Sequence, residues 1–434
     1  MRAGSAHQRA ARLLPSGRYR LQEKLISSSQ QEYNVIRHII MGSNQGEVSS
    51  VRPVELGGTM ASQANLNEKP TMLTYVEQTP AQLKLNVERS EELTAELVDL
   101  YVQKPCHSIW IVACGSSSNG SQCARYFMMK YLQREVKIVS PATFIYGEHD
   151  LHEDDFVFVI SQSGCSTNSI EALDELRKLD ITAIGLTGNV DSDFKDHADL
   201  VVDYGVGEET VGYVTKGVAT LAQFLMLFAI EAGARTGIVS PEQRTELLNE
   251  MADAPRRHEI VQRETWDLYK RHQADFTSMT VVNHCGFLQG YGIACEGALK
   301  FGETIQIPSF AYEGEEWIHG PNLQLTPNYT VVCVDHLTEG SDRLVDIYLA
   351  ARTVTDHAFI VTNSERVDDD HAIRLPFEIK EPLLMPLYVL PFYQIIAHQA
   401  TTDLHRWEKH PLFEERFRKA ISTKTDTIDQ IMPN

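Results

Sequence analysis

This sequence lacks long apolar runs and basic stripes, and each absence excludes a class of protein. No apolar run reaches the ~18 residues that a membrane helix needs, because the longest, Leu221 to Ala232, is interrupted by Gln223 and Glu231. The formal net charge is −20. Nucleic acids and anionic membranes are bound by basic surfaces, so we expect neither as a partner. An anionic small molecule would have to be held by local dipoles.

Cysteine is scarce and scattered. The seven cysteines are an odd number, without C-x-x-C or Cys/His metal spacing. This usage is typical of reduced thiols in the cytoplasm, so we expect a cytoplasmic protein with no disulfide framework. The same spacing predicts no metal site, and no cofactor is expected.

The first 70 residues differ in composition from the rest. Residues 1–22 contain five arginines and no acidic residue, which is the composition of a mitochondrial transit peptide. The remainder of this stretch is rich in Ser, Gln, Gly and Asn without a sustained apolar period, which predicts disorder. Later methionines offer other starts, at Met41, Met60 and Met72. We favour a leader or an upstream misread start over a true transit signal.

Apolar strands alternate with helices in two successive stretches after that leader. With 434 residues, 43% of them hydrophobic, the chain can form two or three domains. A helical pattern from Tyr75 to Val102 precedes the first stretch. Alternation of this kind predicts a doubly wound parallel sheet, and its repetition predicts a duplicated, flavodoxin-like domain. The predicted units are a disordered leader (1–70), a first α/β domain (71–245) and a second (246–434).

The predicted strands and helices are short, regular units. In the first half the strands are 108–113, 156–160, 182–186 and 200–203, with helices 122–132, 168–179 and 215–232. The second half follows a charged helical connector that begins at the capping sequence Ser240-Pro-Glu-Gln243. Its strands are 279–283, 329–334 and 358–361, with helices 291–304, 343–351 and 389–406.

Two serine-rich loops follow strands of the first half. Ser161-Gln-Ser-Gly-Cys-Ser166 lies between a strand and a helix, and Gly115-Ser116-Ser117 repeats the arrangement one strand earlier. Hydroxyl groups and free N–H groups at helix N-termini form a neutral site for a phosphate, although such serines can also merely cap helices. Because adjacent strand ends can converge on one anion, we favour phosphate binding. The candidate residues are Ser116, Ser117, Ser161, Gln162, Ser163 and Ser166.

Three charged residues in the second half share one helical face. Glu296, Lys300 and Glu303 are spaced i, i+4 and i+7, on a helix that begins in a glycine-rich loop after an apolar strand. His319 follows sixteen residues after Glu303. This pattern indicates acid/base chemistry. The alternative is a solvated face whose Glu296 and Lys300 form an ion pair worth ~0.3–0.5 kcal/mol.

These motifs resemble the sugar isomerase (SIS) family, in particular the isomerase part of glucosamine-6-phosphate synthase. The motifs are Ile-Ser161-Gln-Ser-Gly, Ala-Cys114-Gly-Ser-Ser, Glu296-Gly-Ala-Leu-Lys300 and His319-Gly-Pro, and the similarity covers about residues 75–434. The resemblance implies that the serine loops hold a sugar phosphate and that Glu296 and Lys300 lie in the site. It further implies that Glu303 moves a proton between C1 and C2. His319 would open the sugar ring in the neighbouring subunit's site, which implies a homodimer or a higher homo-oligomer.

The chain departs from the synthase at both ends. The synthase carries a glutaminase domain with a nucleophilic cysteine just after its initiator methionine, and nothing in residues 1–68 resembles it. The synthase ends in a lysine-bearing loop, whereas this chain ends in His410-Pro-Leu-Phe-Glu-Glu-Arg416-Phe, similar to the tail of the fructosamine 6-phosphate deglycases. Those enzymes share a Glu and a His sixteen residues apart, so Glu303 and His319 fit both relatives.

The resemblance predicts an enzyme that acts on a phosphorylated sugar or sugar amine. We favour a deglycase or deaminase that cleaves the C–N bond of a 6-phosphorylated fructosamine or amino sugar. One alternative is an aldose–ketose isomerase of the synthase type without a glutaminase domain. Another is a non-catalytic phosphosugar-binding module that regulates a partner. The sugar epimer, the amine and the choice among deglycase, deaminase and isomerase stay open.

Overall fold

The computed structural model describes residues 69–408, 417 and 420–431. The predicted disordered leader and the predicted deglycase-like tail from His410 to Arg416 lie outside these residues. The described residues belong to one compact unit, which begins at Asn67. The predicted boundary between the halves, at residues 245 and 246, stays a prediction, because the largest apolar core contains residues from both halves.

The first half is a five-stranded parallel sheet with the strand order β2-β1-β3-β4-β5. Ile109 and Ile111 face one apolar core, whereas Trp110 and Val112 face another, as the two-residue period of a strand requires. Helices on both sides therefore cover the sheet. The strands are β1 (Ser108–Ala113), β2 (Glu135–Val139), β3 (Phe156–Ile160), β4 (Ile184–Thr187) and β5 (Leu200–Asp203). The helices are α2 (Met72–Glu88), α3 (Ser90–Tyr101), α4 (Gly115–Leu132), α5 (Pro141–Tyr146), α6 (Thr167–Lys178), α7 (Phe194–His197) and α8 (Lys216–Arg235).

The second half repeats this topology. Its parallel sheet has the order β10-β9-β8-β6-β7, which corresponds to the order of the first sheet when the strands are counted from β6. Both sheets have the flavodoxin-like order 2-1-3-4-5, so the prediction of two doubly wound parallel sheets is confirmed. The strands are β6 (Val282–Gly286), β7 (Ser309–Glu313), β8 (Thr330–Val334), β9 (Ala358–Thr362) and β10 (Ala372–Arg374).

Helices surround the second sheet and connect it to the first. Ser240 caps α9 as predicted, because its Oγ accepts a hydrogen bond from the N–H of Gln243 at 3.1 Å. The α-helices are α9 (Pro241–Ala252), α10 (Ala254–Arg271), α11 (Gln273–Ser278), α12 (Leu288–Lys300), α13 (Gly314–Ile318), α14 (Ser341–Arg352), α15 (Pro386–Asp403) and α17 (Ile428–Ile431). A π-helical turn η1 (Phe301–Ile305) extends α12, and η2 (Pro321–Gln324) and η3 (Pro382–Leu384) are 3-10 turns.

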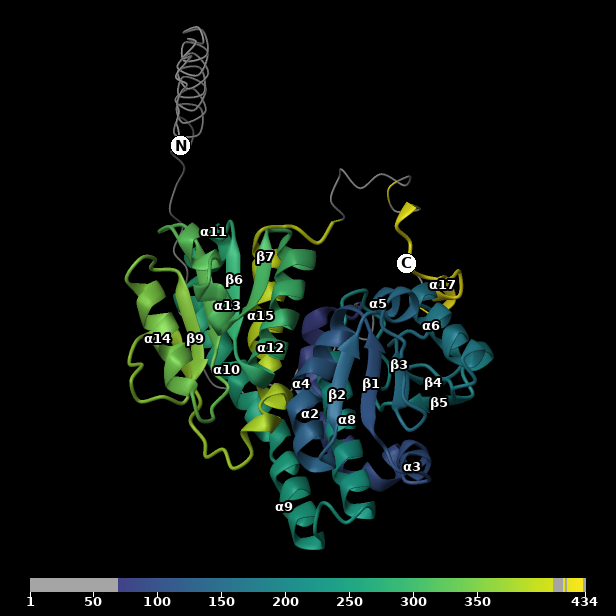
Figure 1. The fold of residues 1–434 in the computed structure, drawn as a ribbon. Coiled ribbons are helices and arrows are strands. Elements are labelled where there is room, and N and C mark those ends of the chain that lie inside the picture. The colour runs from purple at the N-terminus through teal and green to yellow at the C-terminus, as the bar shows by residue number, and fades with distance from the viewer. Residues whose placement is uncertain (1–68, 409–416, 418–419, 432–434) are drawn as a thin grey trace, which may run out of the picture. The chain divides into compact units, whose positions relative to one another are not determined.

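The two halves meet where α12 packs against α4 (Figure 1). Gly292 of α12 lies so close to α4 that a Cβ atom there would be 2.7 Å from the backbone nitrogen of Cys123. A glycine at this position lets the two helices approach closely. The contact brings the C-terminal part of α12, from the second half, against the first turn of α4, from the first half.

Helix α8 is apolar along its length and lies inside the fold. Within the part of the chain that the structure describes, it is the one helix long and apolar enough to cross a membrane. Of its most apolar window, 94% is buried against other elements. It is therefore a core helix of this unit.

Candidate active site

The predicted serine loops flank the point where the strand order of the first sheet reverses. Ser116 lies in the first turn of α4 after β1, and Ser161 directly follows β3, the neighbour of β1. Ligands of doubly wound sheets bind at such a switch point. Gly164 has a left-handed φ of 63°, and a Cβ atom there would lie 1.8 Å from Ser192 Oγ. A glycine is therefore required for this loop to form.

The hydroxyl groups of the second loop form a small cluster. The Oγ atoms of Ser161 and Ser166 are 2.9 Å apart, and Ser163 Oγ accepts a hydrogen bond from the N–H of Cys165. Ser166 is the N-cap residue of α6, yet its side chain makes no capping hydrogen bond. Ser161 and Ser166 thus bond to each other, and the side chain of Ser166 does not cap α6.

Lys424, near the C-terminus, completes the serine cluster. Its Nζ donates hydrogen bonds to Ser163 Oγ at 3.0 Å and to Ser166 Oγ at 2.7 Å. The segment that carries it pairs with the loop, because the N–H of Thr425 donates to the carbonyl oxygen of Cys165 at 3.0 Å. Burial lowers the pKa of Lys424, which the charge of Cys165 partly offsets.

The expectation that this chain lacks a terminal lysine loop was wrong. The comparison with the deglycase tail concerned residues 410–417, whereas the lysine that reaches the serines lies beyond them. Two hydrogen bonds from Thr425 and Thr427 to the carboxylate of Asp193 hold this segment in place. The only signal in the sequence was a lysine near the end of the chain.

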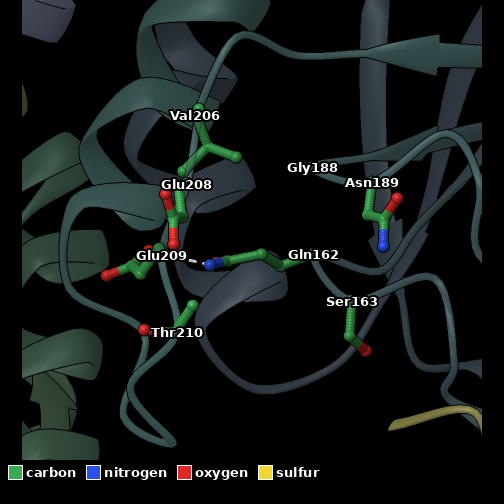
Figure 2. Close-up of a pocket in the computed structure, with 9 residues that line it drawn as sticks. Gln162, Ser163, Gly188, Asn189, Val206, Glu208, Glu209 and Thr210 are labelled. Carbon is green, nitrogen blue, oxygen red and sulfur yellow. Dashed lines mark hydrogen bonds between the residues drawn. The ribbon is translucent and has the colours of Figure 1, made fainter. Parts of the chain in front are cut away.

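Gln162 points away from the serine hydroxyls. Its Nε2 donates to Glu209 Oε2 at 2.7 Å, and the carboxylate of Glu209 also accepts hydrogen bonds from three backbone N–H groups at the start of α8, those of residues 215–217. Burial raises the pKa of Glu209, and these hydrogen bonds act in the opposite direction. Figure 2 shows this pair among the residues that line a cavity, with Ser163, Asn189 and Glu208. The volume of this cavity is about 230 Å³.

Glu296, in the second half, forms hydrogen bonds with side chains of the first half. Its carboxylate is fully buried and accepts hydrogen bonds from Ser116 Oγ at 3.0 Å and from Asn119 Nδ2 at 2.9 Å, both on α4. Lys300 Nζ lies 3.3 Å from the same carboxylate and is 1% exposed. The alternative of a solvated charged face is therefore wrong. Asn119 was missed by the sequence reasoning. Ser117, which was predicted to bind phosphate, instead accepts a hydrogen bond from Ser121 Oγ through its backbone carbonyl oxygen.

Glu303 lies on the π-helical turn that ends α12, beside Lys300. Lys300 Nζ forms an ion pair with Glu303 as well as with Glu296. Burial raises the pKa of Glu303, and the nearby ammonium partly offsets this rise. Burial lowers the pKa of Lys300, but the two carboxylates outweigh it and the pKa is raised. The Glu303 side chain keeps 28% of its surface exposed, so an acid/base group is accessible next to a buried, charged lysine.

One chain does not bring His319 to Glu303. His319 follows α13, whose Gly314 lies against Phe287 at the start of α12, whereas Glu303 lies at the other end of that helix. Fifteen residues separate Leu288 from Glu303, which corresponds to roughly 22 Å of helix. His319 is exposed and lies beyond the carboxyl end of β7, whereas Glu303 precedes the amino end of that strand. The two predicted site residues are therefore far apart within a single chain.

Comparison with known proteins agrees with the resemblance found in the motifs. Residues 104–230 match the SIS domain model. A glutamine–fructose-6-phosphate aminotransferase (isomerizing) of Clostridium tetani is 28% identical over 312 residues, which are 69% of this chain and 50% of that protein. The chain thus spans about half the length of the curated relatives that it matches.

Solved structures share the fold. The C-terminal domain of glucosamine-fructose-6-phosphate aminotransferase from Francisella tularensis has a TM-score of 0.72 at 20% identity, and the match covers 80% of this chain and 100% of that one. Glucosamine-6-phosphate deaminase from Thermotoga maritima has a TM-score of 0.59 at 21% identity, covering 76% of this chain and 94% of that one. The predicted likeness to SIS-domain proteins is confirmed.

Proposed function

We propose that this SIS-domain chain is an enzyme that cleaves the C–N bond of a 6-phosphorylated fructosamine or amino sugar. The observation that carries the proposal is the hydrogen bond between Ser116 Oγ and Glu296. It joins the serine loops of the first half to the helix of the second half that bears Lys300 and Glu303. A phosphate held by the loops would therefore lie in the same site as an acid/base pair.

The serine loops and Lys424 would hold the 6-phosphate. Ser161, Ser163 and Ser166 offer hydroxyl groups, and the start of α6 adds the positive end of a helix dipole. Lys424 supplies a charge that the neutral loops lack, and hydrogen bonds between charged groups are stronger than neutral ones. This capture would fix C1 and C2 of the sugar relative to Glu303.

Glu303 would move the proton. In a fructosamine phosphate it takes a proton from C1, and the released electron pair forms the C1=C2 bond of an enaminol while the C2 oxygen gains a proton. Return of a proton to C2 gives an imine between C1 and nitrogen. Water adds to C1, the amine leaves with a proton, and an aldose 6-phosphate is released. Positioned groups of this kind contribute ~10²–10⁴-fold each.

Lys300 would stabilise the negative charge that develops on the C2 oxygen during proton transfer. Its ammonium is buried between Glu296 and Glu303, so its position is fixed before a substrate binds. A 2-amino sugar phosphate would use the reverse transfer, from C2 to C1, and would lose ammonia from C2. The same residues therefore serve a deglycase and a deaminase.

An aldose–ketose isomerase is the second candidate. The contact of Lys424 with the serine cluster favours it, because the resemblance places a terminal lysine loop in the synthase. The similarity to aminotransferases described as isomerizing points the same way. The proton transfer by Glu303 is common to both candidates, so the products decide between them.

The products formed from three substrates test the function. Purified protein is incubated separately with 6-phosphofructosyl amino acids, glucosamine 6-phosphate and fructose 6-phosphate, and the products are identified by mass spectrometry. We expect release of an amine or ammonia from one of the first two substrates. Interconversion of fructose 6-phosphate with an aldose phosphate, without amine release, would establish the isomerase. Binding of all three without turnover would leave a binding module.

We further propose that His319 acts in the site of a second copy of this chain. The large separation of His319 and Glu303 within one chain supports this proposal, as do the exposed Phe310 and Leu323, which flank the histidine in the sequence. Exposed apolar residues of this kind favour interfaces. The enzyme would then be at least a homodimer with shared sites.

Mixing two inactive variants tests the shared site. Glu303→Gln and His319→Ala proteins are mixed under conditions in which subunit exchange is demonstrated with labelled chains. Under two-fold symmetry each mixed dimer regains one intact site, and statistical mixing restores about a quarter of the wild-type activity. No recovery despite demonstrated exchange would place His319 in its own chain's site.

A further inference from the structure

Histidines and aspartates gather at a second place, on the other side of the second sheet. His272 lies between α10 and α11, and Asp370 and His371 lie in the loop before β10. One ligand atom from each of these three residues lies within 4.8 Å of the others. The strands β10 and β7 are the two edges of this sheet, four strand spacings or ~19 Å apart. The cluster is therefore separate from Glu303, which precedes β7.

The side chain of His272 is held in one orientation. Its Nδ1 lies 3.0 Å from Asp275 Oδ2, and only 8% of its surface is exposed. Its Nε2 lies 3.0 Å from the backbone carbonyl oxygen of Asp370. Both ring nitrogens thus face acceptor oxygens, although a neutral imidazole has a single N–H to donate. When Nδ1–H donates to Asp275, the lone pair of Nε2 faces the carbonyl oxygen, and either a second proton on Nε2 or a nearby metal ion would relieve this repulsion.

We propose that His272 Nε2, the Asp370 carboxylate and His371 bind one divalent transition metal ion of the zinc type. Two imidazoles and a carboxylate are a donor set that zinc prefers, with bonds of about 2.0–2.2 Å. Asp275 orients His272 through its other ring nitrogen, which is the usual second partner of a metal-binding histidine. Solvent would supply the remaining ligand, because the Asp370 side chain is 69% exposed.

The distances allow the ligands to converge with small side-chain movements. Asp370 Oδ2 lies 3.9 Å from His272 Nε2, and Asp370 Oδ1 lies 2.9 Å from His371 Nδ1. Atoms bound to one zinc ion in a tetrahedron are about 3.4 Å apart, given bonds of about 2.1 Å.

The ion would connect distant parts of the chain. His272 and Asp370 are 98 residues apart, so the site would fasten the β9–β10 loop to the corner between α10 and α11. The sequence predicted no metal site because that prediction relied on short Cys/His spacings, and these ligands become neighbours only in the folded chain.

Zinc titration of the full chain tests this site. Untagged protein is treated with a chelator, dialysed and titrated with ZnCl₂ in a calorimeter at neutral pH. We expect one high-affinity ion per chain and a higher melting temperature when zinc is present. Asp370→Asn and His371→Ala should each abolish this binding, and Asp275→Asn should weaken it about 10–100-fold.

A matched control separates this site from other histidines and acids. Asp368→Asn removes the same charge from an exposed residue two positions earlier, and it should bind zinc like wild type. Equal stoichiometry and affinity in wild type, Asp370→Asn and Asp368→Asn would overturn the proposal, because the ion would then bind elsewhere. Failure of the wild-type protein to bind zinc would also overturn the proposal. His272 would then carry a second proton, on Nε2, and donate it to the carbonyl oxygen of Asp370.

Discussion

The two halves of this molecule share one topology but differ at the position that follows the third strand of each sheet. Ser161 follows β3, and its N–H donates to the carbonyl oxygen of Leu186 on the next strand at 3.1 Å. Asp335 follows β8, and its N–H donates in the same way to Val361 at 3.0 Å. The backbones are thus equivalent, whereas one half carries a hydroxyl and the other a carboxylate.

This difference explains why the duplicated fold would have a single anion site. Asp335 is fully buried and accepts hydrogen bonds from Thr362 Oγ1 at 2.6 Å, from the N–H of Leu337 at 3.1 Å and from Ser341 Oγ. The second half therefore fills its own switch point with an internal anion, which would repel a phosphate. Its contribution is instead α12, whose far end brings Lys300 and Glu303 to the switch point of the first half.

The largest expected effect on turnover comes from replacing Glu303, which the second half contributes to the candidate site. Glu303→Gln keeps the size of the side chain but removes the proton acceptor, so turnover should fall by at least ~10²–10⁴-fold while phosphosugar binding stays near wild type. Steady-state kinetics and calorimetry measure the two quantities. Glu316→Gln, which changes an exposed acid of α13, is the control. Turnover within tenfold of wild type would show that Glu303 is not the base.

Introducing an aspartate into the first half, at the position equivalent to Asp335, should give the next largest effect. Ser161→Asp places a carboxylate at the position that Asp335 occupies in the second half. Two like charges ~4 Å apart near a protein surface repel by ~4 kcal/mol, so phosphosugar affinity should fall by about 10²–10³-fold. Inhibition by inorganic phosphate should be lost as well.

A neutral substitution provides the comparison for this charge. Ser161→Asn has almost the same shape as Ser161→Asp, and its loss of affinity should be much smaller. Affinities for fructose 6-phosphate are measured for both variants. Equal affinities in the two variants would mean that no phosphate lies near Ser161.

Removing the charge of Lys424 should have a moderate effect. A hydrogen bond to a charged group is worth about 1.5–3 kcal/mol, so Lys424→Met should weaken phosphate binding about 10–100-fold. Lys195→Met removes an exposed cation of α7 and is the control. Inorganic phosphate is used as a competitive inhibitor for the measurement. A variant as sensitive to phosphate as wild type would place Lys424 outside the phosphate site.

The smallest effect on activity should come from neutralising Asp335, the buried carboxylate of the second half. Asp335→Asn leaves the site untouched but weakens hydrogen bonds that a buried carboxylate accepts, so the free energy of unfolding should fall by about 1–3 kcal/mol. Urea denaturation measures this loss, and kcat/KM should stay near wild type. A large fall in kcat/KM of the folded variant would mean that both switch points serve the reaction.

The order of strands and helices could be predicted because its signals are local. Strands such as Ser108–Ala113 and Phe156–Ile160 are buried throughout and apolar except for Ser108, and both match the observed bounds. The edge strands β2 and β7 were missed because they contain polar residues and are partly exposed. The strand predicted from Met279 begins at Val282, since β-rich residues alone do not fix a boundary.

The candidate site was predictable only in part. The serine loops, Glu296, Lys300 and Glu303 stood out because their spacing places them on one loop or one helical face. Lys424 and Asn119 have no such spacing, and they reach the serines and Glu296 through tertiary packing alone. The role of Asp335 became visible only when the two sheets could be compared strand by strand.

A crystal structure of the Glu303→Gln variant with fructose 6-phosphate tests the central claim most directly. One phosphate per chain should lie within hydrogen-bond distance of Ser161, Ser163 and Lys424, with C1 and C2 of the sugar next to residue 303. The position beside Asp335 should hold no phosphate. A phosphate bound in the second half, or a sugar whose C1 and C2 lie away from residue 303, would contradict the assignment of the site.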